Sequence, residues 1–249
     1  MSASLVFRVL LIITFAAFLG APQVFEPVFA PFAANGAPAI YTQSSLLSLT
    51  LSHLVMVAAA TLAATIVSVG FAILVTRPSG REFLALSRSI ANIGQTFPPV
   101  AVLALAVPVF GFGPIPTLIA LFLYGLLPIF ENALTGLTTI PPSVQEAARG
   151  VGMTDTQRLL RVELPLALPI ILTGIRLTAV ISLSTATIGS TVAAKTLGEV
   201  IIAGLISNNT AFVLQGGLVV AMLALFIHDG FSLLEAALTK PRRDLEQAY

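Results

Sequence analysis

Residues 50–75 read TLSHLVMVAAATLAATIVSVGFAILV, without a charged side chain. A helix needs about 20 mostly apolar residues to cross the hydrocarbon core of a bilayer, so this stretch predicts a membrane-spanning helix. It is the apolar part of a longer charge-free window, residues 27–76, whose beginning is more polar and proline-rich. The run indicates an integral membrane protein.

The composition of the whole chain supports this interpretation. Of 249 residues, 57% are hydrophobic and 9% are charged, against roughly 45–50% and about 25% in soluble domains. So few charges cannot cover a soluble globule, which excludes a soluble enzyme, a nucleic-acid-binding protein and a disordered chain. There is no cysteine, so no disulfide, thiolate metal site or cysteine nucleophile exists.

Three further charge-free windows, residues 89–130, 177–194 and 200–228, predict the other spans. None has the alternating pattern of barrel strands, so we expect an all-α bundle. A turn at 111–116, rich in glycine and proline, divides the first of these windows. The expected spans are 50–75, 90–110, 116–134, 166–190 and 212–234.

The N-terminal segment Leu5–Ala21 allows two interpretations. A basic residue followed by a short apolar stretch is typical of a signal peptide, but the segment is also long enough for a slightly short span. We favour an uncleaved span, because Pro22 would follow the cleavage site. The total is then about six transmembrane helices. Residues 1–45 would hold the first span and a proline-rich outer segment, 46–238 the main transmembrane domain, and 239–249 a short cytoplasmic tail.

The basic residues predict the orientation. In a six-span arrangement, eleven of the twelve lysines and arginines lie on one side and only Lys195 lies on the other. Because positive residues gather on the cytoplasmic side, both termini are expected in the cytoplasm of a bacterial-type inner membrane.

The loop between the fourth and fifth spans, residues 140–165, reads IPPSVQEAARGVGMTDTQRLLRVELP. Ser143 with Glu146, and Thr154 with Gln157, have the spacing of capping boxes, which predicts two short helices separated by Gly150 and Gly152. Short helices are marginal alone, so each must pack on something. The Ala147 and Ala148 face could fold back onto the chain's own helices or dock on a cytoplasmic partner, and we favour docking.

The same loop resembles the signature E-A-A-x3-G-x9-I-x-L-P of ABC-importer permeases, with valine for isoleucine at 162 as the one departure. The matching residues are Glu146, Ala147, Ala148, Gly152, Leu164 and Pro165. In that family this loop is the coupling element that sits in a groove of a separate ATPase subunit. The resemblance implies a type I permease bundle and this coupling role for these six residues.

Three further stretches are similar to osmoprotectant permeases, which import glycine betaine, choline and related quaternary amines. They are TRPSG at 76–80, GQTFPPVAVLA at 94–104 and TATIGST at 185–191. The resemblance implies an importer subunit that moves a small solute inward by alternating access. Its partners would be cytosolic ATPases that bind ATP and Mg, a second permease copy or related permease, an extracytoplasmic solute-binding protein and membrane lipid. No catalytic or metal-binding residue and no cofactor is expected in this chain.

Gln95, Phe97, Pro98 and Pro99 lie inside the third expected span. Two prolines remove backbone donors and disfavour helical geometry at Phe97, so the helix must kink or break there. Broken backbone at membrane depth is tolerated beside protein or a watery cavity. The break could line the translocation pathway, or it could serve packing alone.

A few ionisable residues interrupt the apolar windows. We expect His53 at the membrane interface, and Glu131 either in hydrogen bonds between helices or solvated at the interface. His228 and Asp229 could form a proton relay, but solvation or pairing with Arg176 is favoured, since no other expected span offers a carboxylate to which they could pass a proton. An ion-coupled secondary transporter of a small solute remains the alternative function, although the sequence shows no related halves.

Overall fold

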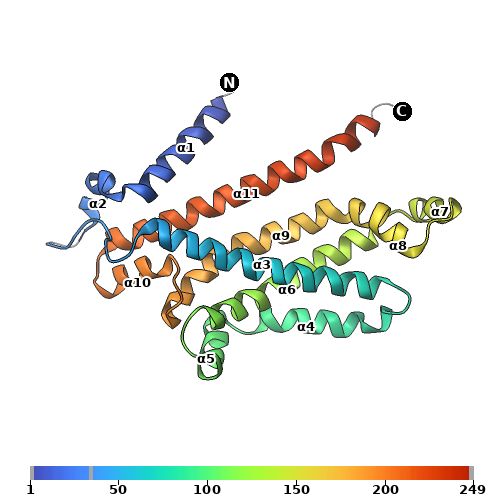
Figure 1. Ribbon diagram of the computed structural model, residues 1–249, viewed down its shortest axis with the longest axis horizontal. Coiled ribbons are helices and arrows are strands. Elements are labelled where there is room, and N and C mark those ends of the chain that lie inside the picture. Colours follow the sequence, from blue (N-terminus) through green and yellow to red (C-terminus); the bar gives the residue numbers. More distant parts are fainter. Residues whose placement is uncertain (1–2, 34–35, 247–249) are drawn as a thin grey trace. The chain divides into compact units, whose positions relative to one another are not determined.

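The computed structural model describes residues 3–33 and 36–246, which form helices and connecting segments without a strand. Figure 1 shows several long helices joined by short ones. The helices are α1 (Ala3–Gly20), α2 (Glu26–Phe29), α3 (Leu46–Thr76), α4 (Leu84–Thr96), α5 (Pro99–Phe110), α6 (Pro114–Thr138), α7 (Pro142–Gly150), α8 (Asp155–Arg158), α9 (Leu164–Ala186), α10 (Gly198–Ile206) and α11 (Thr210–Glu246). The all-α prediction is confirmed.

Four helical stretches of the described chain are long and apolar enough to cross a membrane. They are Leu46–Thr76, Pro114–Thr138, Asp155–Val192 and Thr210–Leu238. Two bent helix pairs raise the number to six if each pair counts as one span. The predicted spans at 50–75, 116–134, 166–190 and 212–234 therefore correspond to continuous helical segments, and the other two overlap the bent pairs.

The expected span at 90–110 is two helices, not one. α4 and α5 meet at an angle of 94°, and Phe97 between them has extended backbone with ψ 133°. This is the break that Pro98 and Pro99 predicted, because neither proline can donate to the preceding turn. The first expected span, Leu5–Ala21, corresponds to the single helix α1, and the chain bends by 111° directly after it, between Val6–Gly20 and Pro22–Phe32.

The tail beginning at residue 239 was predicted as a separate charged segment, but α11 continues to Glu246. Pro241 therefore does not end the helix. The last three residues of that predicted tail, 247–249, lie outside the described residues.

The chain divides into two compact units. The first unit contains the described residues up to Val57, with Leu103–Leu118 and Leu183–Leu225. The second unit contains Ala58–Val102, Ile119–Ser182 and the described residues from Phe226 onward. Several long helices contribute to both.

The core of the second unit is made mainly of small and branched apolar side chains. Phe130 and Ile129 of α6 are fully buried, together with Ala64 and Ala72 of α3 and Ala167 of α9. Small residues allow membrane helices to approach closely, which increases their van der Waals contact. This packing holds α3, α6 and α9 together.

The first unit is tied together by buried polar groups. His53 is fully buried: its Nε2 lies 3.0 Å from the Leu183 carbonyl oxygen, and the Leu197 N–H donates to its Nδ1 over 3.3 Å. The expectation of an interfacial His53 did not foresee that the chain's own segments enclose it. The imidazole instead links α3 to segments far away in the sequence, because a buried polar ring must find hydrogen-bond partners.

Candidate functional site

The loop that carries the signature begins with α7. The helix starts at Pro142, with Pro141 as its N-cap residue and no side-chain cap. The predicted capping box of Ser143 and Glu146 is therefore wrong. Proline is favoured in the first helical position because its φ is already helical and its missing N–H would have no partner there. The helix thus starts earlier than a cap at Ser143 would allow.

α7 ends as the sequence predicts, at Gly150, and the chain reverses at Gly152. Gly152 has a φ of +79°, which glycine adopts without the steric cost of a Cβ atom. The Gly152 N–H donates to the Arg149 carbonyl over 2.9 Å, and the Met153 N–H donates to the Ala148 carbonyl over 3.1 Å. These bonds satisfy carbonyl groups at the end of α7 and fix the direction of the chain.

The second predicted capping box is confirmed. The Thr154 Oγ1 accepts from the Gln157 N–H over 3.3 Å, and the Gln157 Oε1 accepts from the Thr154 N–H over 2.9 Å. α8 leads through a π-helical turn, Leu159–Glu163, into α9. Pro165 lies at the second position of α9, so it belongs to the start of that helix and does not end the loop helix.

The two alanines of the signature differ in exposure. Glu146 and Ala147 are exposed, whereas Ala148 is only 6% exposed. The two alanines therefore do not share one face, because Ala148 packs inside the chain and Ala147 faces outward. Val151, at the turn, is 74% exposed. An exposed edge of Glu146, Ala147 and Val151 is what α7 and its turn offer to another molecule.

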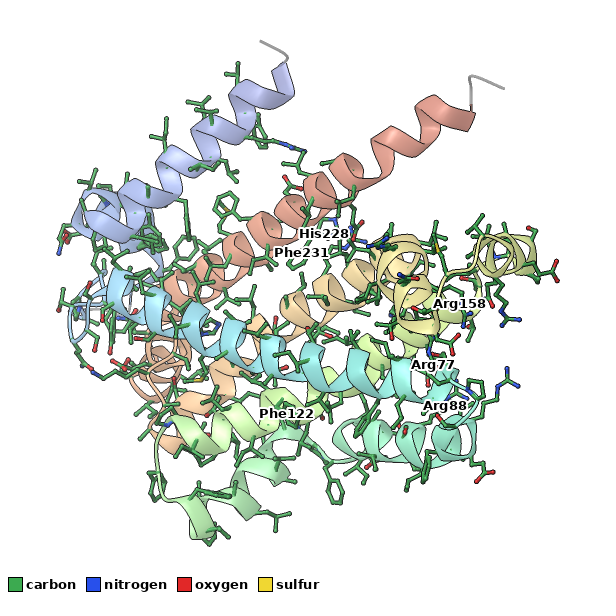
Figure 2. The ribbon with its side chains drawn as sticks, turned by 45° about the vertical axis from the view of Figure 1, so that its right-hand side comes forward. Arg77, Arg88, Phe122, Arg158, His228 and Phe231 are labelled. Carbon is green, nitrogen blue, oxygen red and sulfur yellow. The ribbon has the colours of Figure 1, made fainter. Side chains whose placement is uncertain are left out.

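Glu163 joins this loop to the rest of the second unit. Its carboxylate accepts from Arg158 of α8, with Nε to Oε1 at 2.9 Å, and from Arg77, which directly follows α3. Arg158 also pairs with Asp155 over 2.9 Å. Glu163 and Arg158 are buried, and Figure 2 shows Arg77 and Arg158 on neighbouring ribbons. The network holds α8 and the start of α9 against the end of α3.

Sequence reasoning missed this network. One signal was present: Glu163 is a lone carboxylate inside the apolar signature segment Val162–Pro165. A charge at that place has to be paired when it is buried. The partner Arg77 could not be identified from spacing, because it lies in a different loop.

The predicted pathway residues lie at the break between α4 and α5. The Gln95 Nε2–H donates to the Tyr124 carbonyl over 3.0 Å, and the Tyr124 hydroxyl donates to the Phe97 carbonyl over 2.7 Å. Tyr124 thus satisfies a backbone group freed by the break and fastens it to α6. Phe97 and Pro98 are exposed in this single chain, and Pro99 begins α5.

α4 also makes a close backbone contact with α6. A Cβ atom on Gly94 would lie 2.0 Å from the Leu123 carbonyl oxygen, so only glycine fits. Nearer the other end of α4, Arg88 and Glu131 form a two-bond ion pair at 2.6 and 2.9 Å. Glu131 therefore joins two helices, which is one of the two arrangements expected for it.

Of the two arrangements favoured for His228 and Asp229, solvation or pairing with Arg176, the exposure of His228 fits the first. Arg176 pairs with Glu235 over 3.2 Å and donates to the Ser232 hydroxyl over 3.0 Å. The predicted partners His228 and Asp229 are not in that pair, and His228 is exposed on α11 (Figure 2). Within residues 3–33 and 36–246, no three His, Asp or Glu side chains gather as a metal site.

Comparison with known families gives one match over most of the chain. Residues 68–238 match the family described as "Binding-protein-dependent transport system inner membrane component". The matched part includes both the loop with α7 and α8 and the break between α4 and α5.

Two curated relatives have the following names. The "Osmoprotectant import permease protein OsmY" of Salmonella typhimurium is 40% identical over 185 residues, which cover 74% of this chain and 78% of the relative. The "Glycine betaine/carnitine/choline transport system permease protein OpuCD" of Bacillus subtilis is 37% identical over 188 residues, covering 75% of this chain and 81% of the relative.

A solved structure has a similar fold. The MetNI methionine ABC transporter, in inward-facing conformations, has a chain that aligns with a TM-score of 0.71 at 21% identity. The alignment covers 78% of this chain and 96% of that chain. The fold is therefore that of a type I ABC-importer permease, as the sequence predicted.

Proposed function

This chain belongs to the family of binding-protein-dependent transport system inner membrane components, and from that membership we propose that it moves a quaternary-amine osmoprotectant inward by alternating access. It is the permease subunit of an ABC importer, a multi-pass inner-membrane protein that works with an ATPase and a binding protein. The alternative, an ion-coupled secondary transporter, does not fit this family. Glycine betaine and choline are the solutes expected, because similar permeases are named for them.

The coupling role of the α7 loop rests on its geometry. Glu146 and Ala147 face outward, Gly152 holds the turn in a conformation that suits glycine, and Leu164 and Pro165 begin α9. A displacement of α7 would be transmitted to α9 through α8 and the π-helical turn, which follow it in the chain. It would reach α3 through Arg77 and Glu163. The ATPase, which would bind ATP and Mg, is the partner that causes this displacement.

The break at Gln95, Phe97, Pro98 and Pro99 is the proposed wall or gate of the pathway. Its backbone is non-helical within a membrane span, and one of its carbonyls is satisfied by a side chain of α6. Such a segment can change its angle at a smaller cost than a continuous helix, because fewer helical hydrogen bonds must break. In an importer with two permease subunits, the exposed Phe97 would face the partner subunit or the pathway.

The orientation follows from the positive residues. The loops with Arg77 and Arg158 would lie in the cytoplasm with both termini, and the segment around Lys195 outside. A second permease, identical or related, would complete the transmembrane pathway.

Transport by the purified complex tests the proposal. The permease, its ATPase and its binding protein are placed in vesicles, and uptake of labelled choline and glycine betaine is measured with internal ATP. We expect ATP-dependent uptake that an uncoupler does not abolish while ATP is maintained. Uptake that collapses with the uncoupler, or no uptake of either amine, would contradict the proposal.

A further inference from the structure

The first unit contains a cavity of about 560 Å³ that the coupling mechanism does not use. The residues that line it include Tyr41, Ser190, Glu199, Ile206 and Phe212. Three segments form it: the chain before α3, the region from the end of α9 through α10, and the beginning of α11, which lies beside α10 (Figure 1). The volume is in the range of small-ligand sites, about 300–1,000 Å³.

Glu199 carries the charge of this cavity. It lies in the first turn of α10, where the helix dipole favours a carboxylate. Its Oε1 accepts from the Tyr41 hydroxyl over 2.8 Å and from the Ser44 hydroxyl. Both donors are neutral, and within the described residues Glu199 forms no ion pair. The cavity wall therefore contains a half-buried negative charge with no cation to balance it.

The aromatic side of the cavity is rigid. Tyr41 and Phe212 pack edge to face, with ring centres 5.3 Å apart and planes at 88°. The Tyr41 N–H donates to Gln215 over 3.1 Å, and the Gln215 amide donates to the Ala39 carbonyl over 2.7 Å. Burial and the hydrogen bond to Glu199 raise the pKa of Tyr41 to about 12, so its hydroxyl stays a neutral donor. The ring and the carboxylate are thus held in one arrangement before a ligand arrives.

We propose that this cavity is a low-affinity site for a small quaternary ammonium cation. The inference rests on the proposed function, since it assigns that solute class a binding place in the permease. A trimethylammonium group has no N–H to donate, so aromatic rings and a nearby negative charge recognise it. Glu199 supplies the charge, and Tyr41 and Phe212, which are 2% and 7% exposed, supply the aromatic part of the lining. In the proposed orientation it opens on the outer side, where the binding protein releases solute.

The chemistry also predicts a preference within the solute class. Choline carries one positive charge, whereas glycine betaine carries a carboxylate as well, which Glu199 would repel at short range. The cavity should therefore bind choline and tetramethylammonium more tightly than glycine betaine. Removing the charge of Glu199 should remove this preference.

Binding to the full-length permease in lipid nanodiscs tests the site without the other subunits. Tetramethylammonium, choline and glycine betaine are titrated, and the dissociation constant is measured from the ligand's methyl NMR signal. Glu199→Gln should weaken tetramethylammonium binding about tenfold, the effect of losing a charge contact and part of an aromatic contact. Phe212→Leu keeps an apolar side chain without the ring and should weaken it in the same direction. Glu26→Gln, an exposed acid of the same unit outside the cavity, is the matched control and should bind as the wild type.

Unchanged tetramethylammonium binding in a folded Glu199→Gln permease would overturn the site. If that variant also lost its association with the binding protein, the cavity would be a contact site for a side chain of the binding protein and not a cation site. Transport by the complete importer separates the two proposals. Choline uptake that is identical in wild type and Glu199→Gln at limiting choline overturns the site but leaves the proposed function intact. No uptake of any quaternary amine by the wild type overturns the function.

Discussion

Arg77 and Glu163 form an ion pair that joins the end of α3 to the π-helical turn before α9. Glu163 accepts from Arg158 as well, so one carboxylate lies between two guanidinium groups. Glu163 is 5% exposed and Arg158 is 8% exposed, which makes this a largely buried network. Because α7 and α8 are joined to the helices of the second unit at this point, the network fixes where the loop lies relative to the end of α3.

Replacing Glu163 should therefore lower the stability of the fold much more than replacing an exposed acid. Glu163→Gln leaves Arg77 and Arg158 without their shared charge, and breaking a buried pair typically costs about 3–5 kcal/mol. We expect a clearly lower midpoint of thermal unfolding in detergent and ATP hydrolysis that is poorly coupled to uptake.

Glu131→Gln is the control for that variant. It breaks the pair with Arg88. The Arg88 side chain is 52% exposed and the Glu131 side chain 36%, and an exposed ion pair contributes about 1 kcal/mol or less to stability. Equal unfolding midpoints for the two variants would show that the Glu163 network is not a structural link.

The contact between α4 and α6 gives a second prediction. An alanine at Gly94 would place its Cβ atom 2.0 Å from the Leu123 carbonyl oxygen, so α4 would have to move away from α6. Gly94→Ala should lower the unfolding midpoint and reduce uptake, because the break near Gln95 would lose its support on Tyr124. Gly70→Ala, in α3 and without an atom within 4 Å of the added Cβ, should leave both unchanged. A Gly94→Ala protein as stable and active as the wild type would contradict the close packing.

The sequence predicted those features that depend on local chemistry. The apolar run at 50–75 gave α3 because an uncharged stretch of that length has few alternatives in a membrane. Pro98 and Pro99 predicted the break after α4 because their effect on the preceding backbone does not depend on the rest of the fold.

Features that depend on distant segments were not predictable in the same way. The expected cap at Ser143 was wrong because Pro142 starts the helix earlier, a competition between two local signals. His53 was expected at the interface, but its partners Leu183 and Leu197 come from other parts of the chain. Glu199 directly precedes the charge-free window 200–228, yet only the fold places Tyr41 beside it.

Cysteine labelling tests the orientation, since the chain has no cysteine of its own. Ser79→Cys and Thr154→Cys should react with an impermeant maleimide only from the cytoplasmic side, and both positions are exposed. On the other side, Asn208→Cys should react only from outside, but Asn208 has a φ of +52°, which cysteine tolerates less well. Lys195→Cys is exposed and free of that constraint, so it should give the same result. Labelling of Thr154→Cys from outside would invert the arrangement and remove the basis for ATPase coupling.

Selectivity for the solute should depend largely on the binding protein. The chain has no tryptophan, and the two rings of the proposed cation site are mostly buried, so a complete aromatic cage is absent from the cavity described above. Calorimetry of the permease alone should therefore show no sub-micromolar binding of choline or glycine betaine. Tight binding by the isolated permease would place selectivity in this chain.

Gly152 gives the sharpest test of coupling. A β-branched residue at a φ of +79° is strained by roughly 1–3 kcal/mol, so Gly152→Val should misplace the exposed edge of Glu146 and Ala147. The spanning helices would be untouched, because nothing lies within 4 Å of the added Cβ atom. The variant should insert normally and lose either ATPase association, measured by pull-down, or uptake coupled to hydrolysis, measured in vesicles. Glu146→Ala should act in the same direction more weakly, since it removes an exposed contact without straining the turn.

Gly150→Val is the matched control for Gly152→Val. Gly150 is the last residue of α7, is not among the residues with positive φ, and also has nothing within 4 Å of an added Cβ atom. Valine there replaces glycine in a helical conformation, where glycine is itself about 0.8–1 kcal/mol less favourable than alanine, so the turn should keep its shape. The two variants add the same side chain two residues apart, but only Gly152→Val places it on a residue with positive φ. If Gly152→Val transports at the wild-type rate with its ATPase bound, this loop is not the coupling element.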